Sequence, residues 1–384
     1  MAEVISTIEI EDIYEHELNF LIGSGASFGL FPTLATEMKI DDEQWETIET
    51  LAQYFEETGK KQLRTLLFMY YYKQCIEPVM SFNLEELRDD DTISGKDIKI
   101  GVIDNYKKFI STLYGILKSR KEHEKKINIF TTNYDSCFVE AYEEILQESK
   151  IPLNLNDGTR GFKTKFLEAR HFDSIEVRRG VFDSNEYKMP QLNIVHLHGS
   201  IYWRKDNELI QVQYHGYNED RLIEDIAQEL NDFQAIIENS ESKRANFNVI
   251  KVSDDFQGIS DKFWKKYNSL PIVNPTKWKF YETVFEEHYY QMLRYMSYVL
   301  ERKNSILIVF GFSFADEHIR NLIKRSLENK SLTMFVCCHK DNVYNKISSY
   351  FKEYNNVKFI KLKERLDFTK FNSEVFCIPR NKEA

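Results

Sequence analysis

The sequence predicts an α/β fold, a Rossmann-like and mostly parallel sheet with large helical insertions. Two observations lead to this prediction. Short, continuous apolar runs recur along the chain, which is typical of strands buried on both faces. Several of these runs pass directly into a glycine-rich or polar turn and then into a helical pattern, and this order is characteristic of doubly wound domains.

The predicted strands are unevenly spaced along the 384 residues. The clearest passages from strand to turn read LNFLIGSGAS, INIFTTNYDS and ILIVFGFSFADEHI. In chain order, the runs predicted as strands are 18–22, 127–131, 194–197, 305–310, 334–338 and 357–360.

Two long stretches between these strands, roughly 37–120 and 201–304, carry Leu, Tyr and Glu at helical spacing. We interpret both as insertions into one domain covering 1–384, because predicted strands resume after each of them. The segment 150–190 has few helical signals and contains the turn-rich LNLNDGTRG. The segments predicted as helix within the insertions are LAQYFEETGKKQLRTLLFMYYYKQ, RLIEDIAQELNDFQAIIEN and FEEHYYQMLRYMSYVLERK.

Composition and charge exclude several classes of protein. With 42% hydrophobic and 29% charged residues, the chain is globular and not disordered. The net charge of −10 argues against an extended nucleic-acid interface, which needs clustered Lys and Arg. We see no run long enough to span a bilayer and no signal peptide, because the opening MAEVISTIEIEDIYEHEL is acidic.

The five cysteines include no CxxC pair, which argues against a zinc ribbon and against a secreted disulfide scaffold. We therefore predict a cytoplasmic protein. The cysteines are Cys75, Cys137, Cys337, Cys338 and Cys377.

A glycine-rich turn at residues 23–27 directly follows the first predicted strand. Small residues let the backbone approach an anion closely, and N–H groups at the start of a following helix would supply donors. The full dinucleotide fingerprint would place glycine three positions after Gly25, where Phe28 stands. A tight turn without a ligand is the alternative interpretation. The turn consists of Gly23, Ser24, Gly25, Ala26 and Ser27.

Polar residues close three further predicted strands, at the sheet edge where ligands of open α/β sheets bind. Asn133 and Asp135 follow the second strand and are candidates to orient a polar ligand; helix caps or turn formers are the alternative. Gly311 and Ser313 follow the strand 305–310 and offer another glycine turn and hydroxyl beside a phosphate or ribose.

The sequence HLHGS closes the strand 194–197. Period-two geometry places His196 and His198 on the same face, where one imidazole could act as a general base. The pair could instead bind a metal together with Asp316 and His318, or be two hydrogen-bonded structural histidines.

The order of these motifs resembles that of the sirtuin family, NAD-consuming proteins on a Rossmann-like sheet. The family motif Gly-Ala-Gly-x-Ser is matched at 23–27 with one Ala-to-Ser change, and Thr-Gln-Asn-x-Asp at 131–135 with Thr for Gln. The catalytic His-Gly is matched by His198 and Gly199, and Gly-Thr-Ser at 311–313 with Phe for Thr. The resemblance is confined to these motifs and covers well under half of the chain.

Two family features are missing. Protein-deacylating sirtuins hold a structural zinc with two CxxC pairs, whereas this chain has no cysteine between Cys137 and Cys337. Their Gly-Ile-Pro-Asp-Phe-Arg loop is reduced to a glycine and a proline in GLFPTLATEM. The chain is similar to zinc-free sirtuin domains of bacterial anti-phage systems, notably in HLHGSIYW and GFSFADEHIRNLI, and these domains hydrolyse NAD to nicotinamide and ADP-ribose.

The resemblance implies an NAD+ hydrolase without a required metal. Asn133 would orient water and ribose, His198 would be the general base and Asp135 would bind the nicotinamide carboxamide. Residues 23–27, with Gly311 and Ser313, would hold pyrophosphate and ribose. It further implies a homo-oligomer that depletes NAD in anti-phage defence, with a HerA-type hexameric ATPase or another phage sensor as partner and no direct contact with membrane or nucleic acid. A deacylase, a non-catalytic NAD or ADP-ribose sensor and a metal-dependent nuclease are the alternatives.

Overall fold

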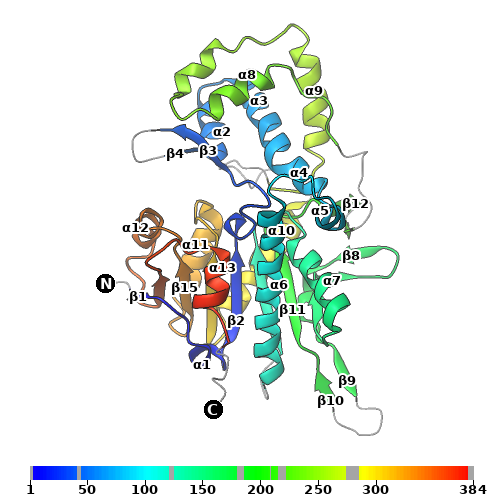
Figure 1. The fold of residues 1–384 in the computed structure, drawn as a ribbon, viewed down its shortest axis with the longest axis vertical. Coiled ribbons are helices and arrows are strands. Elements are labelled where there is room, and N and C mark those ends of the chain that lie inside the picture. Colours follow the sequence, from blue (N-terminus) through cyan, green and yellow to red (C-terminus); the bar gives the residue numbers. More distant parts are fainter. Residues whose placement is uncertain are drawn as a thin grey trace.

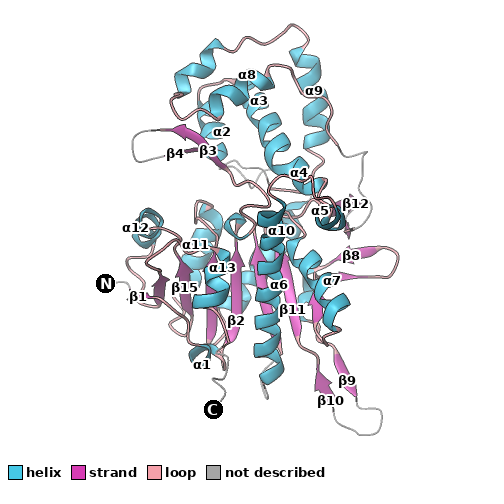
Figure 2. Ribbon diagram, viewed as in Figure 1, coloured by secondary structure: helices cyan, strands magenta, loops and turns pink. Residues whose placement is uncertain are grey.

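The computed structural model describes residues 3–40, 45–120, 125–179, 186–207, 209–214, 222–273 and 285–378. Its centre is an eight-stranded sheet of order β1-β16-β15-β14-β2-β5-β11-β6 in which all neighbouring strands are parallel (Figure 1, Figure 2). The strands are β1 (Glu3–Ile5), β2 (Glu17–Ile22), β5 (Lys126–Thr131), β6 (Asn154–Asn156), β11 (Gln191–His196), β14 (Ser305–Phe310), β15 (Thr333–Cys337) and β16 (Val357–Ile360).

Helices cover both faces of this sheet, as in a doubly wound fold. Phe20 of β2 points to the face covered by α6, α7 and α13, whereas its neighbour Leu21 points to the face covered by α10, α11 and α12. This confirms the predicted fold class. The helices are α6 (Lys96–Ser119), α7 (Cys137–Ser149), α13 (Phe368–Lys370), α10 (Phe285–Leu300), α11 (Glu317–Ser326) and α12 (Asp341–Tyr350).

A second group of helices lies beyond the carboxyl ends of the strands, at the top of Figure 1. We call α2, α3, α8 and α9 the helical lobe. Aromatic side chains join its two sequence segments: Phe55 lies 5.2 Å from Phe247 and Phe68 lies 5.0 Å from Trp264, measured between ring centroids. The lobe helices are α2 (Ile48–Glu57), α3 (Lys61–Tyr71), α8 (Leu230–Ile237) and α9 (Phe256–Tyr267).

The helices of the insertions differ in three ways from the prediction. The single helix predicted from LAQYFEETGKKQLRTLLFMYYYKQ is interrupted between α2 and α3, because Gly59 has a positive φ of 68°. The helix predicted from residue 221 begins only at Leu230, and residues 222–227 are non-helical. Each insertion range also contains a helix that packs on the sheet, α6 in the first and α10 in the second.

The remaining elements are short. Residues 150–190, predicted to be rich in turns, contain several two- or three-residue strands. Within the described ranges no helix is both long and apolar enough to cross a membrane. These elements are α1 (Ile10–Ile13), η1 (Ser24–Ala26), β3 (Ala35–Lys39), β4 (Trp45–Thr47), η2 (Tyr72–Ile76), α4 (Glu77–Met80), α5 (Leu84–Asp89), β7 (Thr159–Arg160), β8 (Lys165–Leu167), η3 (Ala169–Asp173), β9 (Val177–Arg179), β10 (Glu186–Lys188), β12 (Trp203–Asp206), β13 (Leu209–Val212), η5 (Arg244–Val249) and η6 (Phe371–Val375).

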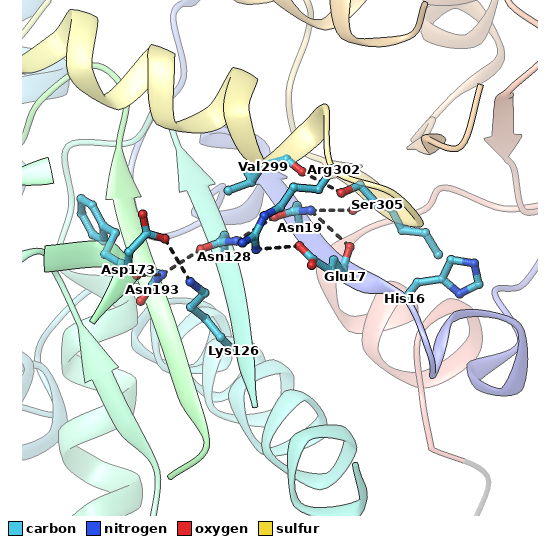
Figure 3. Close-up of polar contacts among 12 residues, drawn as sticks. His16, Glu17, Asn19, Lys126, Asn128, Asp173, Asn193, Val299, Arg302 and Ser305 are labelled. Carbon is cyan, nitrogen blue, oxygen red and sulfur yellow. Dashed lines mark hydrogen bonds and ion pairs between the residues drawn. The ribbon is translucent and has the colours of Figure 1, made fainter. Parts of the chain in front are cut away.

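A row of asparagine side chains crosses the sheet beneath α10 (Figure 3). Asn19, Asn128, Asn193 and Asn156 occupy paired positions on β2, β5, β11 and β6. Successive carboxamides are hydrogen bonded, with Nδ2–Oδ1 distances of 2.8, 2.8 and 3.0 Å, and the Tyr295 hydroxyl donates to Asn128 Oδ1 at 2.9 Å. Since a shifted strand would leave these buried groups unpaired, this asparagine ladder fixes the register of the four strands.

Candidate functional site

The order of the sheet reverses between β2 and β14. The chain builds outward from β2 to β5 and β11, then returns to place β14 on the other side of β2. Ligands of open α/β sheets bind outside the strand ends at such a reversal. The glycine turn at 23–27 and Gly311 meet there so closely that a Cβ on Gly25 would lie 2.7 Å from Gly311 Cα. Gly311 itself has a φ of 67°, so glycine is required at this contact.

The backbone N–H groups of Gly23, Gly25, Ala26 and Ser27 donate to carbonyl groups of the protein itself. Gly25 N donates to Gly311 O at 3.0 Å, and Ala26 N donates to Gly23 O at 3.0 Å. The turn contains only the 3₁₀-helix η1, and no α-helix follows it within residues 28–40. The glycines allow two backbone segments to pack closely, and the contact of the turn with an anion remains a prediction.

Ser27, the last residue of the turn, is the centre of a buried polar cluster. Its Oγ donates to Asp135 Oδ2 at 2.7 Å and accepts from Asn133 Nδ2 at 3.1 Å. The Tyr106 hydroxyl of α6 lies 2.8 Å from the same Oγ, and burial raises the pKa of this phenol well above its usual value. Asp135 Oδ1 accepts from Cys137 N at 3.2 Å. Both carboxylate oxygens thus have partners inside the protein, and Asp135 acts first as a support for Ser27.

Asn133 is held by three contacts, and one atom of its side chain has no partner in the segments that the structure describes. Its backbone N donates to Thr131 Oγ1 at 3.0 Å, its backbone O lies 3.0 Å from His196 Nδ1, and its Nδ2 is bound to Ser27. The side-chain oxygen Oδ1 is buried and has no hydrogen-bond partner among the described residues. A buried acceptor without a donor is costly, by about 1–3 kcal/mol, and a ligand hydroxyl or water would satisfy it.

The two histidines of HLHGS have different environments. Strand β11 ends at His196, so the alternation expected to place both side chains on one face does not extend to His198. His196 is buried against Asn133, and burial lowers its pKa. His198 Nε2 lies 2.8 Å from Asp316 Oδ2, and Asp316 is the N-cap residue of α11.

The alternative metal site is not assembled by these side chains. His196 lies against the backbone of Asn133 and His198 against Asp316, and Asp316 also accepts the backbone N–H of His318. In the part of the chain that the structure describes, no three His, Cys, Asp or Glu side chains are grouped so as to hold a metal ion.

A segment that follows the helical lobe crosses the His198 loop. Val273 N donates to His198 O at 3.0 Å, and Val273 O accepts from the Tyr134 hydroxyl at 3.1 Å. Gly199 has a φ of 77°, and a Cβ there would lie 2.2 Å from Pro271 O. Only glycine allows the two segments to cross here, which explains why glycine follows His198 in this chain.

Ser313 lies apart from the buried cluster. It is exposed, and its Oγ accepts from Ala315 N at 3.3 Å. Sequence reasoning missed Tyr106 and Tyr134 as members of the site. Tyr106 lies in the middle of α6 and far from any of the motifs, so it carries no local signal, whereas Tyr134 stands inside the TTNYD motif and could have been included.

A parallel, doubly wound sheet with a glycine contact and buried polar groups at its reversal point places the protein in the Rossmann-like α/β class. Residues 127–360, more than half of the chain, match the family model of the SIR2-like domain. The chain belongs to the SIR2-like domain family. Domains of this family are generally NAD-dependent enzymes, so the membership implies use of NAD.

The matched region contains Asn133, Asp135, His198, Gly311 and Ser313. It begins after the glycine turn, which joins the site through the Ser27 hydroxyl. No curated protein sequence matches the chain.

Proposed function

We propose that the protein hydrolyses NAD+ at the bond between nicotinamide and ribose, giving nicotinamide and ADP-ribose. One observation carries the proposal: Asn133 presents a buried carboxamide oxygen, without a hydrogen-bond partner in the described part of the chain, at the ligand-binding edge of a SIR2-like sheet. A ribose hydroxyl or a water molecule is a suitable donor for this oxygen, so the residues fit NAD+.

The nicotinamide ring carries a positive charge while it is bonded to the ribose in NAD+. Nicotinamide therefore departs as a neutral molecule and keeps the electron pair of the broken C–N bond. Asn133 orients the attacking water or the ribose and remains uncharged at all pH values. His198 accepts the proton that the water loses as its oxygen bonds to the ribose carbon, and passes this proton to solvent. Asp135 orients Ser27 and thereby Asn133; its predicted contact with the nicotinamide carboxamide would be additional to this role.

The test is the consumption of NAD+ alone by the purified protein, measured as nicotinamide and ADP-ribose by liquid chromatography. Asn133→Ala and His198→Ala should each lower the rate at least about 10²-fold, the usual contribution of a positioned general base or orienting group. Asn231→Ala, an exposed asparagine of α8, is the control and should leave the rate unchanged. Circular dichroism should show that all three variants are folded. Full turnover by both site variants would sink the proposal.

A second arm adds an acylated lysine peptide, because a deacylase would consume NAD+ efficiently only in its presence. The anti-phage role, the homo-oligomer, the cytoplasmic location and the HerA-type ATPase or other phage-sensing partner remain proposals from the sirtuin resemblance. The partner is tested by repeating the NAD+ assay with candidate partners, and the homo-oligomer by measuring the mass of the protein in solution.

A further inference from the structure

The His198–Asp316 pair joins two distant parts of the sheet edge. His198 follows β11 and Asp316 follows β14, and two other strands, β2 and β5, lie between these in the sheet. In the loop after β14, Phe314 adopts a positive φ of 57° and its carbonyl accepts from Arg320 Nη1 at 2.6 Å, which fixes the backbone two residues before Asp316. The side chains of His198 and Asp316 are only 12% and 6% exposed.

The two oxygens of Asp316 have separate tasks. Oδ1 accepts from His318 N at 3.0 Å and Ile319 N at 3.2 Å, which caps the first turn of α11. Oδ2 lies 2.8 Å from His198 Nε2. A helix N-terminus stabilises the charged form of a carboxylate, and a carboxylate can only accept hydrogen bonds. The proton between the two side chains therefore belongs to Nε2, and Nδ1 is the nitrogen that can accept a proton.

We infer that Asp316 is a positioning residue that fixes the tautomer and orientation of His198 and so makes Nδ1 the general base. The inference rests on the proposed NAD+ hydrolysis. When His198 takes the proton from water, Asp316 stays ionised and stabilises the imidazolium across the same 2.8 Å contact. The sequence motifs suggested Asp316 only as a possible metal ligand.

Asp316→Asn and Asp316→Ser separate this role from capping. Asn, Asp and Ser are comparably good N-cap residues, so both variants should retain α11. With its oxygen occupied by the cap, Asn presents its NH₂ group to Nε2 and imposes the wrong tautomer. Ser does not reach His198 and imposes neither tautomer. We expect kcat to fall about 10²–10⁴-fold in Asp316→Asn and less in Asp316→Ser, with KM little changed in both.

A purely structural role predicts the opposite order, because Asn has the size of Asp and should be the milder change. That order would overturn the inference. Asp367→Asn is the matched control, since Asp367 caps α13 through Lys370 N at 2.9 Å and lies in a different loop. It should leave kcat unchanged.

A double variant tests whether Asp316 acts through His198. If it does, His198→Ala/Asp316→Asn should have the same kcat as His198→Ala alone. If the fold-loss of kcat in the double variant equals the product of the two single fold-losses, the inference is contradicted.

Histidine ¹⁵N NMR gives a readout that does not depend on activity. The signal absent from His198→Ala should show an Nε2–H tautomer in the wild type and an Nδ1–H tautomer in Asp316→Asn. If the tautomers are as expected but NAD+ is not cleaved, the proposed function fails and the pairing stands. If NAD+ is cleaved and the tautomer is the same in both proteins, the pairing fails alone.

Discussion

Ser27→Ala removes the hydroxyl that connects the glycine turn to the two motif residues Asn133 and Asp135. Three contacts are lost: the bond to the Asp135 carboxylate at 2.7 Å, the bond from Asn133 at 3.1 Å and the contact with Tyr106 at 2.8 Å. A hydrogen bond to a charged group contributes about 1.5–3 kcal/mol and a neutral one about 1 kcal/mol. We therefore expect the free energy of unfolding to fall by about 3–5 kcal/mol.

The same substitution should reduce activity through Asn133. Without the Ser27 hydroxyl, the Asn133 side chain loses the hydrogen bond that fixes the orientation of its carboxamide. If this bond favours the productive orientation by about 1–1.4 kcal/mol, its loss corresponds to a 5- to 10-fold lower kcat. Ser24→Ala is the control for stability, since Ser24 lies in the same turn but is exposed.

Urea denaturation followed by the fluorescence of the four tryptophans measures the first effect, and NAD+ consumption measures the second. A Ser27→Ala protein whose unfolding free energy is within about 1 kcal/mol of that of Ser24→Ala would refute the central role of this hydroxyl.

Two further predictions concern the core and the thiols. Asn128→Ala should lower the free energy of unfolding by about 3–4 kcal/mol, because it removes the bonds that its side chain makes with Asn19, Asn193 and Tyr295; a loss below about 1 kcal/mol in urea denaturation would contradict the ladder. Iodoacetamide at pH 8 should label Cys377 before the buried cysteines, as read by mass spectrometry, since burial raises the pKa of Cys75 to about 12. The folded protein keeps thiol protons that the unfolded chain releases, so the free energy of unfolding should fall as pH rises from about 9 towards 12.

The long strands were predictable because they are buried on both faces and therefore apolar throughout. Strands β1 and β6 were not, since each has three residues and lies at an edge of the sheet. Two helices of the helical lobe were predicted to be longer than they are. Helical spacing alone does not reveal that the chain turns at Gly59, or that α8 begins only at Leu230.

The site was predictable as far as neighbouring strands determine it. Asn133 and Asp135 meet Ser27 because β2 and β5 are adjacent and parallel, so their carboxyl ends lie side by side. The sequence grouped His198 with Asp316 only as possible ligands of a metal; their direct contact depends on the path of a loop that crosses two strands. The bond from Gly25 N to Gly311 O also depends on backbone packing that no residue type encodes by itself.

The division of the helical lobe between two sequence segments has a consequence for synthesis of the protein. Phe55 and Phe68 emerge from the ribosome with the first segment, but their partners Phe247 and Trp264 follow much later. From the end of α3 at Tyr71 to the start of α8 at Leu230 there are 230 − 71 = 159 positions. At roughly 5–20 residues per second, the nascent chain carries this aromatic surface uncovered for about 8–30 s. During this interval the first half of the lobe is a natural substrate for chaperones.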